Sequence, residues 1–505
     1  MPYPFALPTT SATPLTDFFH SSSHPSLVLT ATSHRAVVRD ALKRHKRLPP
    51  ASQASNLSAV LDALTTYLPY LLAIHSALFD HSSSFGSAPT WIQVDQIRPL
   101  EIEWRTTLSS SPIPGREPAR TKVKGLQNEL AFVLQTMAYT HTLLSRTELL
   151  RLHTTSSLTL EQRASIATAA MRYLLSAQSL HAYVSTLPPS VEGAIPVDIS
   201  QATSAGLAAL ALAEATLVVV TKDDPYTAAV AEDRDKNSKE WMIAAPTIPK
   251  VRAHLFARLC IAAGDHAAKA GGLLARSSSG GAFGSGSGAA GLIGVFAGGK
   301  LDESLTKYVD DLRRTAKGKA ARFLGIDAEI AGKTGEAIAW LRGAKKELAI
   351  LAAESTGEEG KRKGLKGLKQ SWAERKEDKK LEKGGLADWG LEAGRLEEAR
   401  VVEWLEAKWV KSNDMINVQT IPPSEPLLAS MPSGREYHTP KSYKPDPLDS
   451  ATLASMSAPP DPSRPAFTGN EEDSGDEVSN FRPQVSNTPG TFPGSSAEHS
   501  SGDYY

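Results

Sequence analysis

The sequence predicts an all-α protein with an elongated helical body and a loose C-terminal tail. Helical periodicity recurs from about residue 30 to about residue 412. The alternating pattern of β-strands is almost absent, apart from a possible short strand pair around IEWRTTL at 102–108. The segment 126–144 carries two apolar stripes on opposite faces, which suits a helix with neighbours on both sides. We therefore expect helices stacked side by side.

The two stripes of segment 126–144 are read at about 100° per residue. One contains Leu126, Leu130, Val133, Met137 and Leu144, and the other contains Phe132, Thr136, Tyr139 and Leu143. Only a narrow polar face is left between them. The segment is therefore interpreted as a packed scaffold helix rather than as part of a reactive site.

The remaining helices are placed by their boundary signals. A helix at 34–48 ends at Pro49, and one at 55–78 contains Pro69, where we expect a kink. A helix beginning at Thr159 has a capping box with Gln162, and Asp198 with Gln201 repeats that arrangement. Further helices are predicted at 249–275, fraying at its Gly-Gly pair, and at 301–323, 328–355 and 365–412.

Two segments have the composition of loops. Residues 277–300 are rich in Gly and Ser and are predicted to be a flexible linker. From about residue 446 the chain is dominated by Pro, Ser and acidic residues, which bury too little apolar surface to offset their ordering entropy. We expect one domain at 1–445 and a disordered tail at 446–505.

Composition limits the classes of function. The 505 residues include 55 basic and 55 acidic side chains, so no net field favours nucleic acid or a strongly anionic membrane. A single cysteine, Cys260, excludes an intramolecular disulfide framework and a thiolate-rich metal site. The N-terminus lacks the pattern of a secretory signal, and the longest apolar run, 206–220, is too short for a membrane span and contains Glu214. A soluble cytoplasmic protein is expected.

Two nucleotide-binding patterns occur in the Gly-rich segment. Gly286, Gly288 and Gly291 match G-x-G-x-x-G, but the preceding segment is predicted to be a helix instead of the required strand. The phosphate-loop spacing that ends at Lys300 is followed by Leu301, where a hydroxyl residue must hold the metal. A linker is the better interpretation of both.

No candidate active site assembles from the remaining residues. His20 and His24 lack a neighbouring carboxylate, and His141 lacks a carboxylate or thiol at helical spacing. Cys260 lies in an apolar segment and is expected to be a core residue. We expect no catalysis, no metal and no cofactor.

The charged run at 361–380 is interpreted as a solvated helix face, with contact to anionic lipid headgroups as the alternative.

Several segments, read in order, resemble the Bro-domain family. They are IEWRTTL, with Glu103, Trp104 and Arg105, followed by KGLQNELAFVLQTMAYTHTLLS at 124–145, then LAEATLVVVTKDDPYTAAV from Leu212 and TGEAIAWLRGAKKELAILA from Thr334. The segments ATSHRAVVRDALKRHKRLPPASQ, PIPGREPAR and IPPSEPLLASMPSGREYHTPKSY are similar to those of fungal members in ambient-pH signalling. The resemblance implies a boomerang-shaped domain with a tetratricopeptide-like helical core.

The resemblance also implies a non-catalytic adaptor. Its partner would be the C-terminal helix of the Snf-type ESCRT-III subunit, and it would act with PalA and PalB in the complex that leads to cleavage of the transcription factor PacC at alkaline pH. Recruitment would be peripheral, to the plasma membrane or to endosomes. The alternatives are a general adaptor of endosomal sorting and, from another class, a nucleotide-using enzyme, which a deletion of 280–298 would inactivate.

The family's partner patch can be transferred onto this sequence residue by residue. It falls on Leu217 and Val230 after the first family helix, and on Ile338, Leu341 and Leu348 in the second. Arg234 stands where the family has leucine, and Asp224-Pro225 interrupts the first segment. Ordinary core positions are the alternative interpretation of all five apolar residues. YPFAL at 3–7 resembles a peptide that other family members recognise, but a simple extended arm is the better interpretation.

Overall fold

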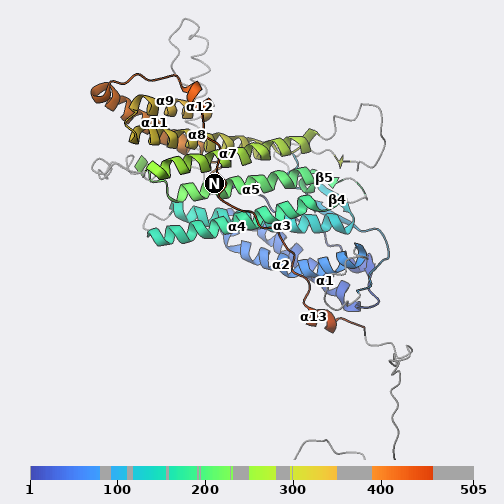
Figure 1. The fold of residues 1–505 in the computed structure, drawn as a ribbon. Helices are drawn as coiled ribbons and strands as arrows, with labels where there is room; N and C mark the ends of the chain where they lie inside the picture. Colours follow the sequence, from blue (N-terminus) through green and yellow to red (C-terminus); the bar gives the residue numbers. More distant parts are fainter. Residues whose placement is uncertain are drawn as a thin grey trace, which may run out of the picture. The chain divides into compact units, whose positions relative to one another are not determined.

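The computed structural model describes residues 2–79, 92–110, 118–154, 159–189, 193, 195–227, 229–230, 250–279, 296–297, 300–349 and 389–458. Long helices dominate this part of the chain (Figure 1). The helices are α1 (Pro25–Arg47), α2 (Pro50–Phe79), α3 (Leu126–Thr154), α4 (Leu160–Thr186), α5 (Gln201–Lys222), α7 (Lys250–Ser279), α8 (Glu303–Ile330), α9 (Thr334–Glu347), α11 (Arg395–Ser412), α12 (Ser424–Ala429) and α13 (Ser450–Ser455). Short 3-10 helices occur at η1 (Leu15–Asp17) and η2 (Val197–Ile199), and a short π-helix at η4 (Asn413–Asn417).

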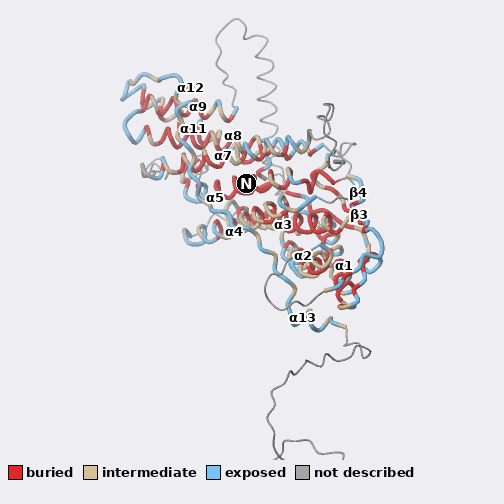
Figure 2. The backbone as a smooth tube through the Cα atoms, turned by 45° about the vertical axis from the view of Figure 1, so that its right-hand side comes forward, coloured by how far each residue is buried: buried red, intermediate tan, exposed pale blue. Residues whose placement is uncertain are grey.

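Helices that follow one another along the described chain also pack against one another, from α1 on α2 through to α8 on α9. Figure 1 shows this order as a stack, with α1 and α2 at one end and α9, α11 and α12 at the other. The faces between neighbouring helices are buried along the stack (Figure 2). The prediction of an all-α fold is confirmed. Both apolar stripes of α3 are buried except at their C-terminal ends, where Leu143 and Leu144 are partly buried.

The strands are short and pair two by two. They are β1 (Phe19–His20) with β2 (Asp95–Gln96), β3 (Glu101–Arg105) with β4 (Arg120–Lys124), and β5 (Ile195–Pro196) with β6 (Phe296–Ala297). The β3–β4 pair is antiparallel, with Trp104 opposite Thr121, and it confirms the predicted strand pair. Thr10 adds an isolated bridge on the other side of Trp104.

Local signals placed some helix ends correctly. Thr159 forms the predicted capping box, because its hydroxyl accepts from Gln162 N–H while the Gln162 side chain accepts from Thr159 N–H. The prediction for Asp198 was wrong. Ser200 caps α5 by accepting from Thr203 N–H, and the Asp198 carboxylate instead accepts from the backbone N–H groups of Thr107 and Leu108.

Other boundaries differ for tertiary reasons. Helix α1 begins at Pro25, earlier than predicted, because Leu27 and Val28 are buried in the core. Helix α7 continues through the Gly pair at 271–272 because it is packed between α5 and α8. The single helix predicted at 328–355 is interrupted at Gly332, whose φ of 77° ends α8 before α9 begins. The loop at 280–295 and the charged run at 361–380 lie outside the described residues.

An extended C-terminal segment follows α12 and contacts several helices of the stack. Arg258 Nε donates to Ser433 O and Arg435 N–H donates to Arg258 O on α7, and the Tyr443 ring packs against Tyr183 on α4. Ala458 N–H then donates to Ser23 O beside α1. These contacts extend the compact unit to Ala458, past the boundary at 445 that composition predicted. The rest of the tail lies outside the described residues.

Candidate partner-binding site

The central helix α5 carries one buried carboxylate, Glu214, in an otherwise apolar run. Its Oε1 accepts from the Tyr308 hydroxyl on α8 at 2.7 Å and from Tyr3 N–H at 3.0 Å. Burial raises the pKa of Glu214 to about 7, and the hydrogen bond from Tyr308 only partly offsets this effect. Helices α5 and α2 are long and apolar enough to cross a membrane, but 89% of the most apolar 18-residue stretch of α5 is buried inside the protein. It is therefore a core helix.

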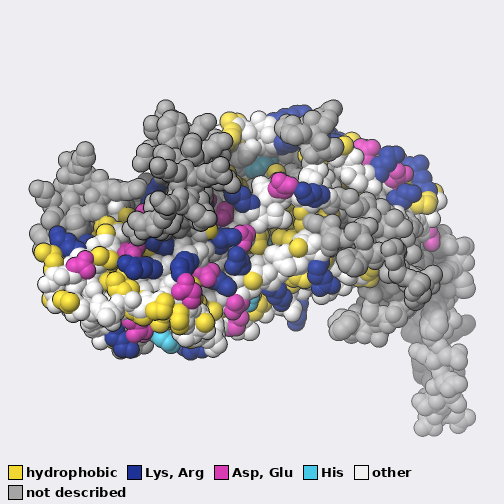
Figure 3. All heavy atoms as spheres, turned by 90° about the horizontal axis from the view of Figure 1, so that it is seen from above, with side chains coloured by type: hydrophobic (Ala, Val, Ile, Leu, Met, Phe, Trp, Pro, Cys, Tyr) yellow, Lys and Arg dark blue, Asp and Glu magenta, His cyan; other side chains and the backbone are white. Residues whose placement is uncertain are grey.

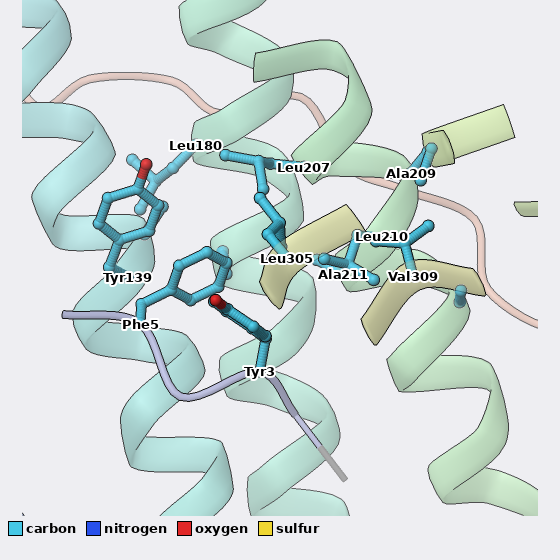
Figure 4. Packing of buried hydrophobic residues seen from close by; sticks show 14 of the residues in the cluster. Tyr3, Phe5, Tyr139, Leu180, Leu207, Ala209, Leu210, Ala211, Leu305 and Val309 are labelled. Atoms are coloured by element: carbon cyan, nitrogen blue, oxygen red, sulfur yellow. The ribbon is translucent and has the colours of Figure 1, made fainter. Parts of the chain in front are cut away.

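The N-terminal arm, residues 2–9, lies against α3, α5 and α8. Tyr3, Phe5 and Leu7 are buried. The Phe5 ring stacks on Tyr139 with ring centroids 4.5 Å apart (Figure 4). The Tyr3 ring lies against the Tyr308 ring with centroids 5.1 Å apart. The carbonyl of Pro2 accepts from Arg146 Nη1. The YPFAL segment is therefore a built-in part of the core and is not displayed as a peptide for another protein.

Two hollows flank this arm. Pro2 lines one of about 180 Å³ at the C-terminal half of α5, and Phe5 and Leu7 line another of about 500 Å³ beside α1 and α2. The smaller one has an apolar floor made by Leu217 and Val218 with Leu149 and Leu312. Its rim carries charges of both signs, from Arg163, Lys222 and Glu397. We call this smaller hollow the α5 pocket.

The five predicted patch residues are not equivalent in the structure. Ile338, Leu341 and Leu348 have no exposed surface, and Leu348 packs on Gly318, where an added Cβ would lie 2.6 Å from it. These three are core residues and cannot touch a partner in this conformation. Leu217 is 8% exposed and lines the α5 pocket, and Val230 is 9% exposed. Of the five, Leu217 lines the α5 pocket, and Arg234 lies outside the described residues.

A buried ion cluster that the sequence did not reveal borders the pocket, and two of its members, Asp224 and Lys319, line it. Arg322 bonds both Asp224 and Glu398, and Lys319 Nζ lies 2.6 Å from Glu398 Oε2. Burial alone would raise the pKa of Asp224, but Arg322 and Lys319 lower it to about 2. The acidic residue that seemed to interrupt the family segment therefore connects the end of α5 to α8 and α11. Its partners are far away in sequence, so no local spacing could predict them.

Of the residues considered for chemistry, His24 and Cys260 are buried, His141 is half-buried and His20 is exposed. Burial lowers the pKa of His141 to about 4 and raises the pKa of the Cys260 thiol to about 12. Gln135 bonds His181 Nδ1 at 3.0 Å inside the core. Among the described residues, no group of three His, Cys, Asp or Glu side chains could hold a metal ion. The α5 pocket remains the candidate site.

Comparison with known proteins gives the family. The pH-response regulator protein palC of Emericella nidulans is 41% identical over 98% of this chain and 99% of its own length. The chain belongs to the PalC family of pH-response regulators. The palC protein of Cryptococcus neoformans is 33% identical over 30% of the chain and 28% of its own length. No protein-family model matches the chain.

Solved structures with a similar chain course are Bro1 domains. The ALIX BRO1 CHMP4C complex aligns with 89% of this chain and 96% of its own, at a TM-score of 0.46 and 14% identity. A structure described as the basis for endosomal targeting by the Bro1 domain aligns with 90% of this chain and 95% of its own, at a TM-score of 0.42 and 14% identity. The PalC assignment itself rests on the 41% identity.

Proposed function

We propose that this PalC-family chain is a non-catalytic adaptor of ambient-pH signalling that binds the C-terminal helix of the Snf-type ESCRT-III subunit. Bound in this way, it helps to assemble, with PalA and PalB, the complex that activates PacC by proteolysis. Recruitment is peripheral, to the plasma membrane or the endosome. The 41% identity to a pH-response regulator, which extends over nearly the whole chain, supports a role in pH signalling. The α5 pocket supports a binding role.

The size and lining of the α5 pocket carry this proposal. Its volume of about 180 Å³ is below the roughly 300–1,000 Å³ of pockets that enclose small-molecule ligands. It suits anchor side chains projecting from a partner. An amphipathic helix offers apolar side chains at i, i+3 and i+4 for the floor made by Leu217 and Leu312, and polar flanks for Lys222 and Glu397 at the rim.

The test blocks the pocket from its exposed edge, so that the core is left intact. Thr221 lines the pocket and is exposed, and Thr221→Trp fills the hollow without removing a buried side chain. The matched control is Thr168→Trp, at an exposed position on α4 outside the pocket. Binding of a peptide from the C-terminal helix of the Snf-type subunit is measured by calorimetry on the full chain.

We expect micromolar binding, about −8 kcal/mol, by the wild type and by Thr168→Trp, and loss of at least about tenfold in Thr221→Trp. Circular dichroism verifies that all three proteins are folded. Equal binding by both Trp variants would move the partner surface away from the α5 pocket. No binding by the folded wild type would remove the ESCRT-III partner from the proposal.

A further inference from the structure

Three large apolar side chains are exposed within four residues after α11. Met415 is 72% exposed, Ile416 76% and Val418 78%. Single exposed apolar residues are common on protein surfaces, but a contiguous group indicates an interaction site. Figure 1 shows this segment as the orange coil at the upper left, beyond the end of α11. We call these three residues the apolar tip.

The backbone of the tip is fixed to the turn between α8 and α9. Gln419 Nε2 donates to Gly332 O at 2.9 Å, and Gln419 Oε1 accepts from Gly335 N–H at 3.0 Å. Asn417 Nδ2 donates to the Thr334 hydroxyl at 2.9 Å. Hydrogen bonds of Asn417 and Gln419, on either side of Val418, therefore hold the tip against the turn between α8 and α9.

The tip also holds a strained residue. Val418 has φ of 47° and ψ of 39°, the left-handed region that β-branched residues rarely adopt. Strain of this kind persists where the surrounding structure enforces it, and it occurs frequently at functional sites. Here the hydrogen bonds of Val418 and Gln419 to Asn413 hold the left-handed conformation, and the Val418 side chain is exposed.

The backbone polar groups of Val418 and Gln419, where the tip ends, form hydrogen bonds within the protein. Val418 N–H donates to Asn413 O at 2.7 Å. The buried Asn413 side chain also closes the turn, since its Oδ1 accepts from Gln419 N–H and its Nδ2 donates to Gln419 O. A segment that enters hydrocarbon must satisfy its backbone groups without water. The backbone N–H groups of Val418 and Gln419 and the carbonyl of Gln419 meet this requirement through Asn413.

The side chains of the tip favour lipid over a protein pocket. Hot spots of protein interfaces are enriched in Trp, Tyr and Arg, whereas valine is under-represented there. The tip contains neither an aromatic residue nor an arginine. Its nearby charges offset one another, with Lys411 one turn before Asp414 and Lys333 paired with Glu336 at 3.2 Å. Figure 3 shows hydrophobic, basic and acidic side chains intermingled over this end of the molecule.

From this geometry we infer that the tip of Met415, Ile416 and Val418 inserts into the headgroup and upper acyl region of a lipid bilayer. The side chains provide aliphatic surface, the closed turn reduces the cost of leaving water, and the balanced charges make the contact independent of anionic lipid. This membrane contact is separate from the α5 pocket and does not depend on the ESCRT-III partner.

The test labels the tip with an environment-sensitive fluorophore. Ile416→Cys in the full chain is coupled to a nitrobenzoxadiazole dye, and Ile97→Cys, at a position 62% exposed on another surface, is the control. Cys260 is buried, and because its thiol pKa is raised to about 12 it does not compete for label at neutral pH. The probes are phosphatidylcholine vesicles, with and without phosphatidylserine.

We expect the dye on the Ile416→Cys variant to shift to the blue and brighten on phosphatidylcholine vesicles, with little effect of phosphatidylserine or salt. The dye on the Ile97→Cys variant should respond little. Vesicle flotation of the Met415→Asp/Ile416→Asp variant should fall at least about tenfold below wild type. The proposal is overturned if the dye at the tip does not respond to vesicles, or if the Asp variant floats as well as the wild type. It is also overturned if the dye at the tip responds to protein concentration without lipid, because that result would assign the tip to self-association.

Discussion

Arg322 and Asp224 form an ion pair with no exposed surface, with Arg322 Nη2 2.5 Å from Asp224 Oδ2. The pair belongs to a cluster of four buried charges with Lys319 and Glu398, so that each acid faces both bases. The cluster joins the end of α5 to α8 and α11. It therefore fixes the segment that borders the α5 pocket.

Removing one acid from this cluster should be strongly destabilising. Asp224→Ala leaves Arg322 and Lys319 with excess buried positive charge, and we expect a loss of about 3–5 kcal/mol in the free energy of unfolding. Urea denaturation measures it. The control is Glu148→Ala, which breaks the exposed pair with Arg151 and should change stability by no more than about 1 kcal/mol. Equal effects of the two variants would contradict a stabilising role for the cluster.

Glu214 should make stability depend on pH. Its pKa is about 7 in the folded protein and 4.5 as an ordinary carboxyl, because burial disfavours its charge. Between these values the unfolded chain has released the proton and the folded chain still holds it, so rising pH favours unfolding. From pH 4.5 to 7 the wild type should lose about 3 kcal/mol relative to Glu214→Gln. Parallel stability curves for the two proteins would refute the assignment.

Close contact at Gly434 should decide whether the C-terminal segment stays on the stack. An added Cβ would lie 2.8 Å from the backbone nitrogen of Ala262, which cannot move aside within α7. Gly434→Ala should therefore destabilise the protein by about 1–3 kcal/mol and speed proteolysis after residue 434. Gly272→Ala is the control, because nothing lies within 4 Å and alanine favours the helix by about 0.5–1 kcal/mol. A tolerated Gly434→Ala would mean that this contact is not close.

Strain at Val418 should be released by glycine. Because glycine adopts positive φ freely, Val418→Gly should raise the free energy of unfolding by about 1 kcal/mol. The control, Val37→Gly, replaces a valine that is 55% exposed within helix α1 and should lower stability by about 0.5–1 kcal/mol. Thermal unfolding compares them. If both substitutions lowered stability alike, Val418 would carry no left-handed strain.

Local sequence patterns were enough to predict the stacked helices, the β3–β4 pair and the Thr159 cap, because periodicity and capping act between residues a few positions apart. The sequence segments that resemble the Bro-domain family could also be recognised without a structure. Tertiary structure alone decided that Asp198 holds the loop after β3 instead of capping α5, and that Leu348 lies buried on Gly318 while Leu217 reaches a pocket. Asp224 and Arg322 are 98 positions apart, and the Val418 turn depends on Gly332 and Gly335. Such pairings arise only when distant helices pack, so no local pattern encodes them.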